Sequence, residues 1–81
     1  MICIATFYSH FGAIRFKKYC ERAGVRGRLM PVPRDLSSSC GTCVQYESST
    51  FYPVSEIPEE VEQIVEVGED GYILHFRAEN S

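Results

Sequence analysis

The N-terminal third of the chain changes from a strand pattern to a helix pattern within a few residues, and this change limits the folds it can adopt. Residues 2–8 are mostly β-branched or aromatic, which predicts a strand. From Ser9 to about Ala23, apolar residues recur at helical spacing, which predicts an amphipathic helix. Ser9 stands at an N-cap position, and Gly24 stands where a helix ends. The fold must therefore accommodate a strand that leads directly into a helix.

Two further strands are expected after this helix, with a polar loop between them. Residues 27–32 predict a strand that ends at a proline-rich segment. Residues 33–40 contain proline, arginine, aspartate and three consecutive serines, a composition typical of a loop. The third strand is expected to begin near Cys40 and to run through Tyr46. Residues 51–54 fit either an extra strand or an ordered loop.

The remaining residues predict a second helix and a last strand. Ser55 is placed to cap the helix, and alternation over residues 72–76 predicts the strand. The expected buried stripe of this helix consists of Ile57, Val61, Ile64 and Val65. The predicted order is βαββαβ, an α+β ferredoxin-like sandwich with one antiparallel sheet and two helices on one face. A chain of 81 residues is too short for a second core, so residues 1–81 are expected to form one domain.

This topology makes a prediction about residues that are far apart in the sequence. In the expected order, the start of the first helix and the loop between the second and third strands lie at the same end of the sheet. We therefore expect Ser9, His10 and Gly12 to lie close to Cys40.

Charge and hydropathy exclude some classes of partner. The net charge of −3 does not favour nucleic acid, which is bound by neutralising phosphates. Basic residues cluster in one stretch, which is expected to form a solvated face or to steer an acidic partner protein. They are Arg15, Lys17, Lys18, Arg22, Arg26 and Arg28. No apolar run approaches the roughly 20 residues that cross a bilayer. The first residues have no basic leader, so a cytoplasmic protein without membrane association is expected.

Among the four cysteines, Cys40 is the candidate for reactivity. Cys3 and Cys20 lie in apolar patterns and are expected to fill the core, because cysteine is among the most buried residue types. Cys40 lies in a polar stretch where no core needs filling. The thiolate is the nucleophilic form of cysteine, and a helix N-terminus or a nearby imidazolium favours it. His10 and Arg34 are the candidate sources of positive charge, and Ser39 is a candidate hydrogen-bond donor.

Two neighbours of Cys40 bear on its chemistry. Gly41 allows a sharp backbone turn beside the sulfur. Cys43 completes a Cys-Gly-Thr-Cys segment, but in an extended strand the two thiols point to opposite faces. A turn across residues 40–43 would instead allow a disulfide or a shared metal. One such pair supplies two of the four ligands of a structural zinc site, so no metal is expected within one chain, while a homodimer with two pairs remains open.

Several of these segments resemble the small selenium/sulfur carrier-like proteins. The resemblance covers residues 2–46 and is carried by residues 5–9, Gly24, residues 29–34 and residues 37–41. It implies a carrier that holds sulfur or selenium as a persulfide or selenopersulfide on one cysteine, and the matching position is Cys40. It also implies a cysteine desulfurase-type donor and an acceptor enzyme of selenium or sulfur metabolism. The second cysteine, Cys43, departs from the family pattern.

Two other hypotheses stay open. One is a small dithiol redox or zinc-binding module that uses Cys40 and Cys43. The other is a non-catalytic protein-interaction domain, since the expected fold supports many functions. No catalytic triad, carboxylate pair or phosphate-binding loop is recognisable, and no resident cofactor is expected. A carrier or accessory protein is therefore favoured over a stand-alone enzyme.

Overall fold

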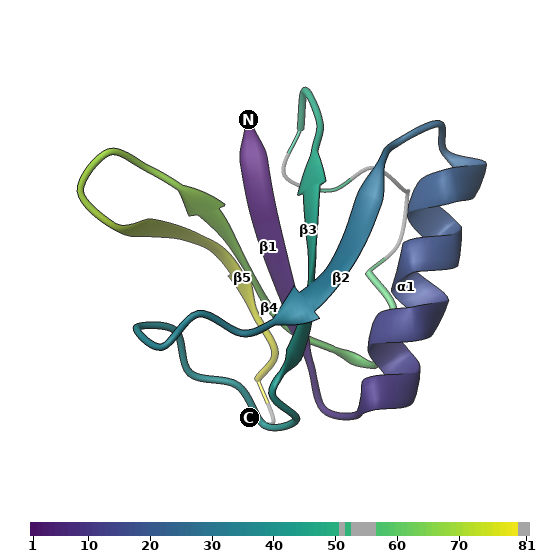
Figure 1. Ribbon diagram of the computed structural model, residues 1–81, viewed down its shortest axis with the longest axis horizontal. Coiled ribbons are helices and arrows are strands. Elements are labelled where there is room, and N and C mark those ends of the chain that lie inside the picture. The colour runs from purple at the N-terminus through teal and green to yellow at the C-terminus, as the bar shows by residue number, and fades with distance from the viewer. Residues whose placement is uncertain (51, 53–56, 80–81) are drawn as a thin grey trace.

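The computed structural model describes residues 1–50, 52 and 57–79, and this part of the chain forms one five-stranded sheet and one helix (Figure 1). The elements are β1 (Ile2–Phe7), α1 (His10–Arg22), β2 (Gly27–Pro31), β3 (Thr42–Glu47), β4 (Val61–Val67) and β5 (Tyr72–Arg77). The strand order is β2-β3-β1-β4-β5, and every neighbouring pair is antiparallel. The predicted order of the first four elements, a strand, a helix and two strands, is therefore observed.

The expectation of a ferredoxin-like sandwich with two helices is wrong. Val61, Ile64 and Val65 lie in β4, which pairs with β1, and not in a second helix. Ile57 precedes β4 and packs against the core. Ser55, the expected helix cap, and most of residues 51–54 lie outside the described residues. The fold is mostly sheet, with β5 added beyond β4 as an edge strand.

A β-bulge explains why β4 has the hydrophobic spacing of a helix. The register between β1 and β4 shifts so that Thr6 pairs with Gln63 while Phe7 pairs with Val61, which leaves Glu62 as the extra residue. The extra residue puts Val61 and Ile64 on the same face although they are three positions apart. In a regular strand, residues on one face are an even number of positions apart. A spacing of three therefore indicated a helix where the strand contains a bulge.

Helix α1 packs on one face of the sheet and forms the larger core. As predicted, Ser9 is its N-cap, and the Ser9 hydroxyl accepts a hydrogen bond from the Gly12 amide at 3.1 Å. Phe16 lies at the centre of the packing, with its ring centroid 5.3 Å from that of Phe7 and 5.6 Å from that of Tyr46. The buried members of this cluster are Cys3, Ala5, Phe7, Ala13, Phe16, Cys20, Val44, Tyr46, Val61 and Ile64.

The opposite face of the sheet is covered in part by the segment between β2 and β3. Ile4, Cys43 and Val65 form a second buried cluster there, and Leu36 from the covering segment packs against it. A hydrogen bond of 2.9 Å from the Tyr72 hydroxyl to an Asp35 carboxylate oxygen ties the segment to β5. Both faces of the central strands are therefore apolar.

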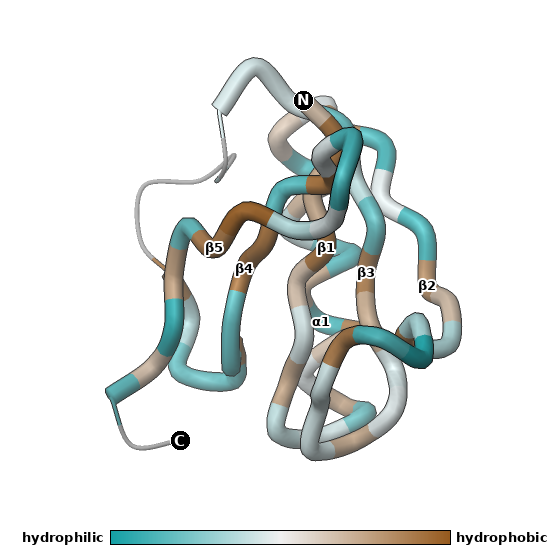
Figure 2. Tube along the Cα trace, turned by 90° about the vertical axis from the view of Figure 1, so that its left-hand side faces the viewer, coloured by the Kyte–Doolittle hydropathy of each residue, from teal (hydrophilic) through white to brown (hydrophobic). Residues whose placement is uncertain are grey.

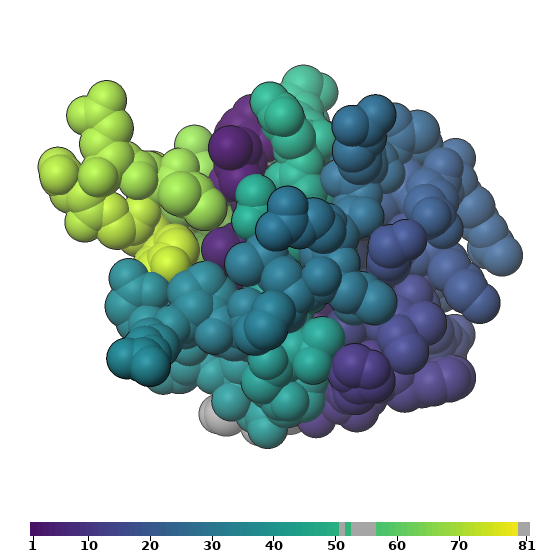
Figure 3. All heavy atoms as spheres, in the orientation of Figure 1, coloured from purple at the N-terminus to yellow at the C-terminus, as the bar shows by residue number. Residues whose placement is uncertain are grey.

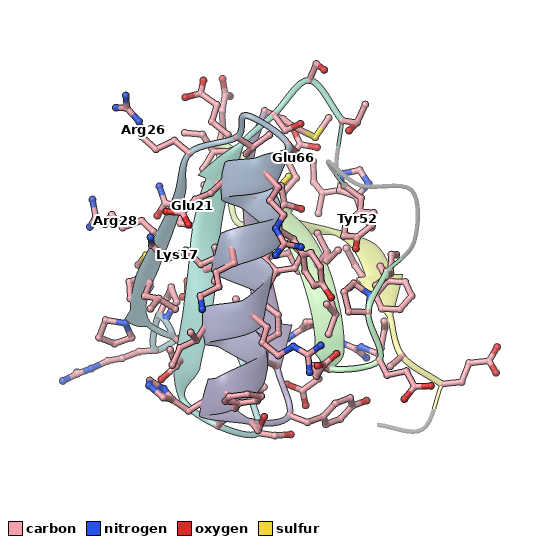
Figure 4. The ribbon with its side chains drawn as sticks, turned by 90° about the vertical axis from the view of Figure 1, so that its right-hand side faces the viewer. Lys17, Glu21, Arg26, Arg28, Tyr52 and Glu66 are labelled. Atoms are coloured by element: carbon pink, nitrogen blue, oxygen red, sulfur yellow. The ribbon has the colours of Figure 1, made fainter. Side chains whose placement is uncertain are left out.

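The basic residues gather on the side of the molecule formed by α1 and β2. Figure 4 shows Lys17, Arg26 and Arg28 there, with Glu21 beside Lys17. The Lys17 ammonium and a Glu21 carboxylate oxygen are 3.1 Å apart. Within residues 1–50, 52 and 57–79, no helix has the length and apolar character needed to cross a membrane.

Candidate functional site

Burial separates Cys40 from the other cysteines. All four cysteines lie in the described part of the chain, and Cys40 is half-buried, whereas Cys3, Cys20 and Cys43 are each 0% exposed. Burial raises the pKa of Cys20 and of Cys43 to about 11, and it also raises the pKa of Cys3. These three thiols stay protonated and shielded at neutral pH. Cys40 is therefore the one cysteine of the four that is partly exposed.

Local hydrogen bonds hold Cys40 between a serine-rich loop and the start of β3. Its thiol donates to the backbone oxygen of Thr42, with the sulfur 3.4 Å away, and its amide donates to the Ser38 hydroxyl at 3.4 Å. Gly41 has a φ of +79°, a conformation that L side chains rarely adopt. The Cys40 side chain packs against the cluster under α1. We refer to residues 37–41 as the Cys40 loop.

Thr42 connects this loop to the start of α1. The His10 ring nitrogen Nδ1 lies 3.0 Å from the Thr42 hydroxyl, across 32 positions of sequence. Thr42 thus contacts His10 through its side chain and Cys40 through its backbone oxygen. The start of α1 and the start of β3 lie at the same end of the sheet, at the bottom of Figure 1. The structure links His10 to Cys40 indirectly, through Thr42.

Ser9, Gly12 and Arg34, the other residues expected to act near Cys40, each have a separate role or position in the structure. Ser9 caps α1. Gly12 is buried, and a Cβ at this position would lie 2.7 Å from the Glu60 Cβ, so glycine is needed for α1 to pack closely there. Arg34 is exposed in the segment between β2 and β3. Ser9 and Gly12 therefore shape the start of α1, which carries His10.

Glu62 anchors the Cys40 loop and was not among the site residues expected from the sequence. One of its carboxylate oxygens accepts from the Ser39 amide at 3.1 Å and from the Thr6 hydroxyl at 3.2 Å, and the other accepts from the Ser39 hydroxyl at 2.6 Å. Its neighbour Gln63 donates from its side-chain amide to the Ser37 backbone oxygen at 2.7 Å. Two consecutive residues of β4 therefore hold the loop in place.

The bulge in β4 provides this anchor. Glu62 is the extra residue at the bulge, and bulges commonly redirect a side chain beside a functional site. The signal that pointed to a strand was the composition of residues 61–67, four of which are valine or isoleucine. A strand prediction for this segment would have placed Glu62 and Gln63 in the sheet, close to the loop.

Cys43 and Cys40 pack into different clusters. Cys43 belongs to the cluster on the open face with Ile4 and Val65, and its sulfur lies 3.8 Å from the Pro31 backbone oxygen. Burial is the main cause of its raised pKa, and the charge of Cys40 adds to it. Among the described residues, no group of three or more His, Cys, Asp or Glu side chains is arranged to hold a metal ion. This geometry favours chemistry on Cys40 alone over a disulfide pair.

Replacing Glu62 by alanine is expected to loosen the Cys40 loop. The change removes the acceptor of three hydrogen bonds, including that of the fully buried Thr6 hydroxyl. We expect the free energy of unfolding to fall by about 1–3 kcal/mol. Hydrogen exchange at the Ser39 amide should also become faster, as NMR can measure.

Glu66→Ala is the matched control for this prediction, since Glu66 lies in the same strand. Its carboxylate oxygen lies 2.8 Å from the His75 ring nitrogen Nε2, and both side chains are partly exposed. An exposed pair of this kind contributes about 0–1 kcal/mol. If the Ser39 amide exchanges equally fast in both variants, Glu62 does not anchor the loop.

Comparison with known proteins gives one family and one short match. A family model described as "Putative Se/S carrier protein-like" matches residues 2–67, which is more than half of the chain. The chain is similar to "Uncharacterized protein YtiA" of Escherichia coli (strain K12), with 40% identity over 38 residues. That match covers 47% of this chain and 45% of the relative, so the chain spans less than half of that protein. No solved structure matches.

Proposed function

The chain belongs to this Se/S carrier protein-like family, and on that premise we propose that Cys40 carries sulfur or selenium as a persulfide or selenopersulfide. The observation that carries the proposal is the contrast between the half-buried Cys40 and the fully buried Cys3, Cys20 and Cys43. A carried atom must be reached by both a donor and an acceptor, and the other three thiols are closed to both.

The proposed transfer needs no external oxidant or reductant. The Cys40 thiolate attacks the terminal sulfur of a persulfide on a donor cysteine, and a new S–S bond forms as the donor's S–S bond breaks. The donor cysteine leaves as a thiolate and takes up a proton, while Cys40 is left as the persulfide. Attack by an acceptor's thiolate or other nucleophile on the terminal sulfur returns Cys40 to the thiolate. The proposed donor is of the cysteine desulfurase type, and the proposed acceptor is an enzyme of selenium or sulfur metabolism.

His10 and the start of α1 are proposed to favour the thiolate. The thiol proton points to the Thr42 backbone oxygen and must leave before attack. A protonated His10, held against the Thr42 side chain, would place positive charge at this end of the sheet, where the positive end of the α1 dipole also lies. A carboxylate near Cys40 would oppose a thiolate, so we assign Glu62 no part in forming it. Glu62 instead positions the Cys40 loop through its hydrogen bonds with Ser39. Arg34, exposed in the segment between β2 and β3, remains the second candidate source of positive charge.

Cys43 is not required for this transfer. Attack by Cys43 on a Cys40 persulfide would release the carried atom and form a disulfide. Such a step would require Cys43 to leave its buried cluster beside Ile4 and Val65. We therefore propose that the carried atom leaves Cys40 by direct transfer to the partner.

The proposal is tested by incubating the protein with a cysteine desulfurase and cysteine, followed by mass spectrometry. The wild type is expected to gain one sulfur atom, which peptide mapping should place on Cys40. Cys40→Ser is expected to gain none. The matched controls Cys20→Ser and Cys43→Ala should gain as much as the wild type, because both residues are buried. Equal loading of Cys40→Ser and the wild type would refute the carrier role of this residue.

A further inference from the structure

The outer face of α1 carries one aromatic and three basic side chains in a line. Positions 11, 15, 18 and 22 of a helix fall within about 60° of one another, and here they point almost directly away from the core face that contains Phe16. These positions are occupied by Phe11, Arg15, Lys18 and Arg22, and all four residues are exposed. Figure 3 shows α1 at the surface of the molecule, on the side away from β5. We refer to these four residues as the α1 stripe.

The charges of the α1 stripe are only partly balanced. The Arg15 guanidinium lies 3.2 Å from a Glu60 carboxylate oxygen, whereas no ion pair within residues 1–50, 52 and 57–79 involves Lys18 or Arg22. The three basic residues line one shallow hollow with Tyr19, of about 130 Å³, which has room for a carboxylate. They are three and four positions apart, and like charges at these spacings destabilise a helix. Carboxylates from another protein would remove this repulsion.

Phe11 gives the stripe a feature that a solvated charged face does not need. It is 65% exposed, the largest exposed fraction of any large hydrophobic residue in the described part of the chain. The Arg15 guanidinium carbon lies 5.8 Å from the centroid of its ring. Aromatic and arginine side chains are enriched in protein–protein interfaces, and the attraction between them strengthens when water is excluded. The stripe therefore has the composition of an interface.

The stripe begins at the end of α1 that lies nearest the candidate site. Phe11 follows His10, whose ring contacts the Thr42 hydroxyl, and the Thr42 backbone oxygen accepts a hydrogen bond from the Cys40 thiol. At about 1.5 Å per residue, the stripe extends about 16 Å from Phe11 to Arg22. Cys40 is half-buried, so a protein donor must approach it in a fixed orientation. A docking surface that begins beside the site provides that orientation.

From these observations we propose that the α1 stripe is the docking surface for the protein that donates sulfur or selenium to Cys40, and that this donor presents an acidic surface to it. Carboxylates of the donor would pair with Lys18 and Arg22, and the donor would cover the ring of Phe11. The identity of the partner rests on the proposed carrier role, whereas its acidic character follows from the stripe. An acidic protein is favoured over a nucleic acid, because the whole chain has a net charge of −3.

Binding of a cysteine desulfurase, measured by isothermal titration calorimetry, tests the proposal. Every protein compared carries Cys40→Ser, so binding is measured whether or not Cys40 accepts sulfur, which the loading assay decides separately. Lys18→Glu with Arg22→Glu should raise the dissociation constant by about a hundredfold, because both salt bridges become repulsive. Arg26→Glu with Arg28→Glu is the matched control, since it changes the net charge equally but lies after α1 and in β2. This control should raise the dissociation constant by less than about threefold, through long-range electrostatics alone.

A second pair of variants tests the aromatic side chain. Phe11→Ala should raise the dissociation constant by about tenfold. Leu74→Ala should leave it unchanged, because Leu74 is 50% exposed in β5, whose hydrophobic stretch lies across the sheet from α1 (Figures 1 and 2). Circular dichroism should confirm that each variant is folded. A desulfurase that does not bind, or that binds the stripe variants as tightly as their matched controls, would overturn the proposal.

Discussion

In the folded protein at neutral pH, one thiol is expected to react rapidly with iodoacetamide, and that thiol is Cys40. The other three cysteines are fully buried, so they react only when the structure opens. Because the pKa of Cys20 and of Cys43 is raised to about 11, about one molecule in ten thousand carries either thiolate at pH 7. We expect Cys40 to react at least about a hundredfold faster than the others. Peptide mass spectrometry over a time course measures all four rates.

The unfolded chain provides the control for this experiment. In guanidinium chloride, burial no longer distinguishes the four thiols, and they should react at similar rates. Rapid modification of Cys43 in the folded protein would contradict the structure, because Cys43 lies in the buried cluster with Ile4 and Val65. It would also favour the dithiol hypothesis, in which Cys40 and Cys43 act as a pair.

The first half of the fold could be predicted because its signals are local. Ser9 at the start of α1 and Gly24 after its end mark the helix, and the apolar residues between them have a regular spacing. The following strand and polar loop are equally clear from composition. The resulting topology places the start of α1 and the start of β3 at the same end of the sheet, where His10 contacts Thr42.

The second half could not be predicted by the same reasoning, because its spacing depends on pairing with β1. The bulge at Glu62 exists only in the context of the partner strand, since it is defined by the register of Thr6 and Phe7. Viewed alone, residues 61–65 have the i, i+3, i+4 spacing of a helix. Tertiary pairing overrides that pattern, and the β-branched composition of the segment was the better guide.

The same error concealed the anchor of the candidate site. The candidate nucleophile was identified from its polar surroundings, which are local in the sequence. Glu62 and Gln63 reach the Cys40 loop from 23 and 26 positions away, across the sheet. A helical interpretation of β4 gave no reason to bring them there. Residues that position a site from another strand are the ones that local patterns miss.

Raising the pH above 9 is expected to destabilise the fold through its buried thiols. Cys20 and Cys43 have pKa values of about 11 in the folded state, against an ordinary value of 9.0. Between these values the folded state binds more protons than the unfolded state, so stability is complete below pH 9 and falls as the pH rises toward 11. A shift of two units corresponds to about 2–3 kcal/mol for each thiol. Urea titrations at a series of pH values measure this loss.

Alanine variants separate this effect from the alkaline titration of other groups. The buried Tyr46 also has a raised pKa, caused first by burial, so it contributes to the same loss in every variant. Cys20→Ala and Cys43→Ala should each lose less stability between pH 8 and about 11 than the wild type. The comparison uses the slope with pH, so the cost of removing a buried sulfur at neutral pH does not affect it. Equal slopes for Cys20→Ala, Cys43→Ala and the wild type would show that these thiols are not buried in solution.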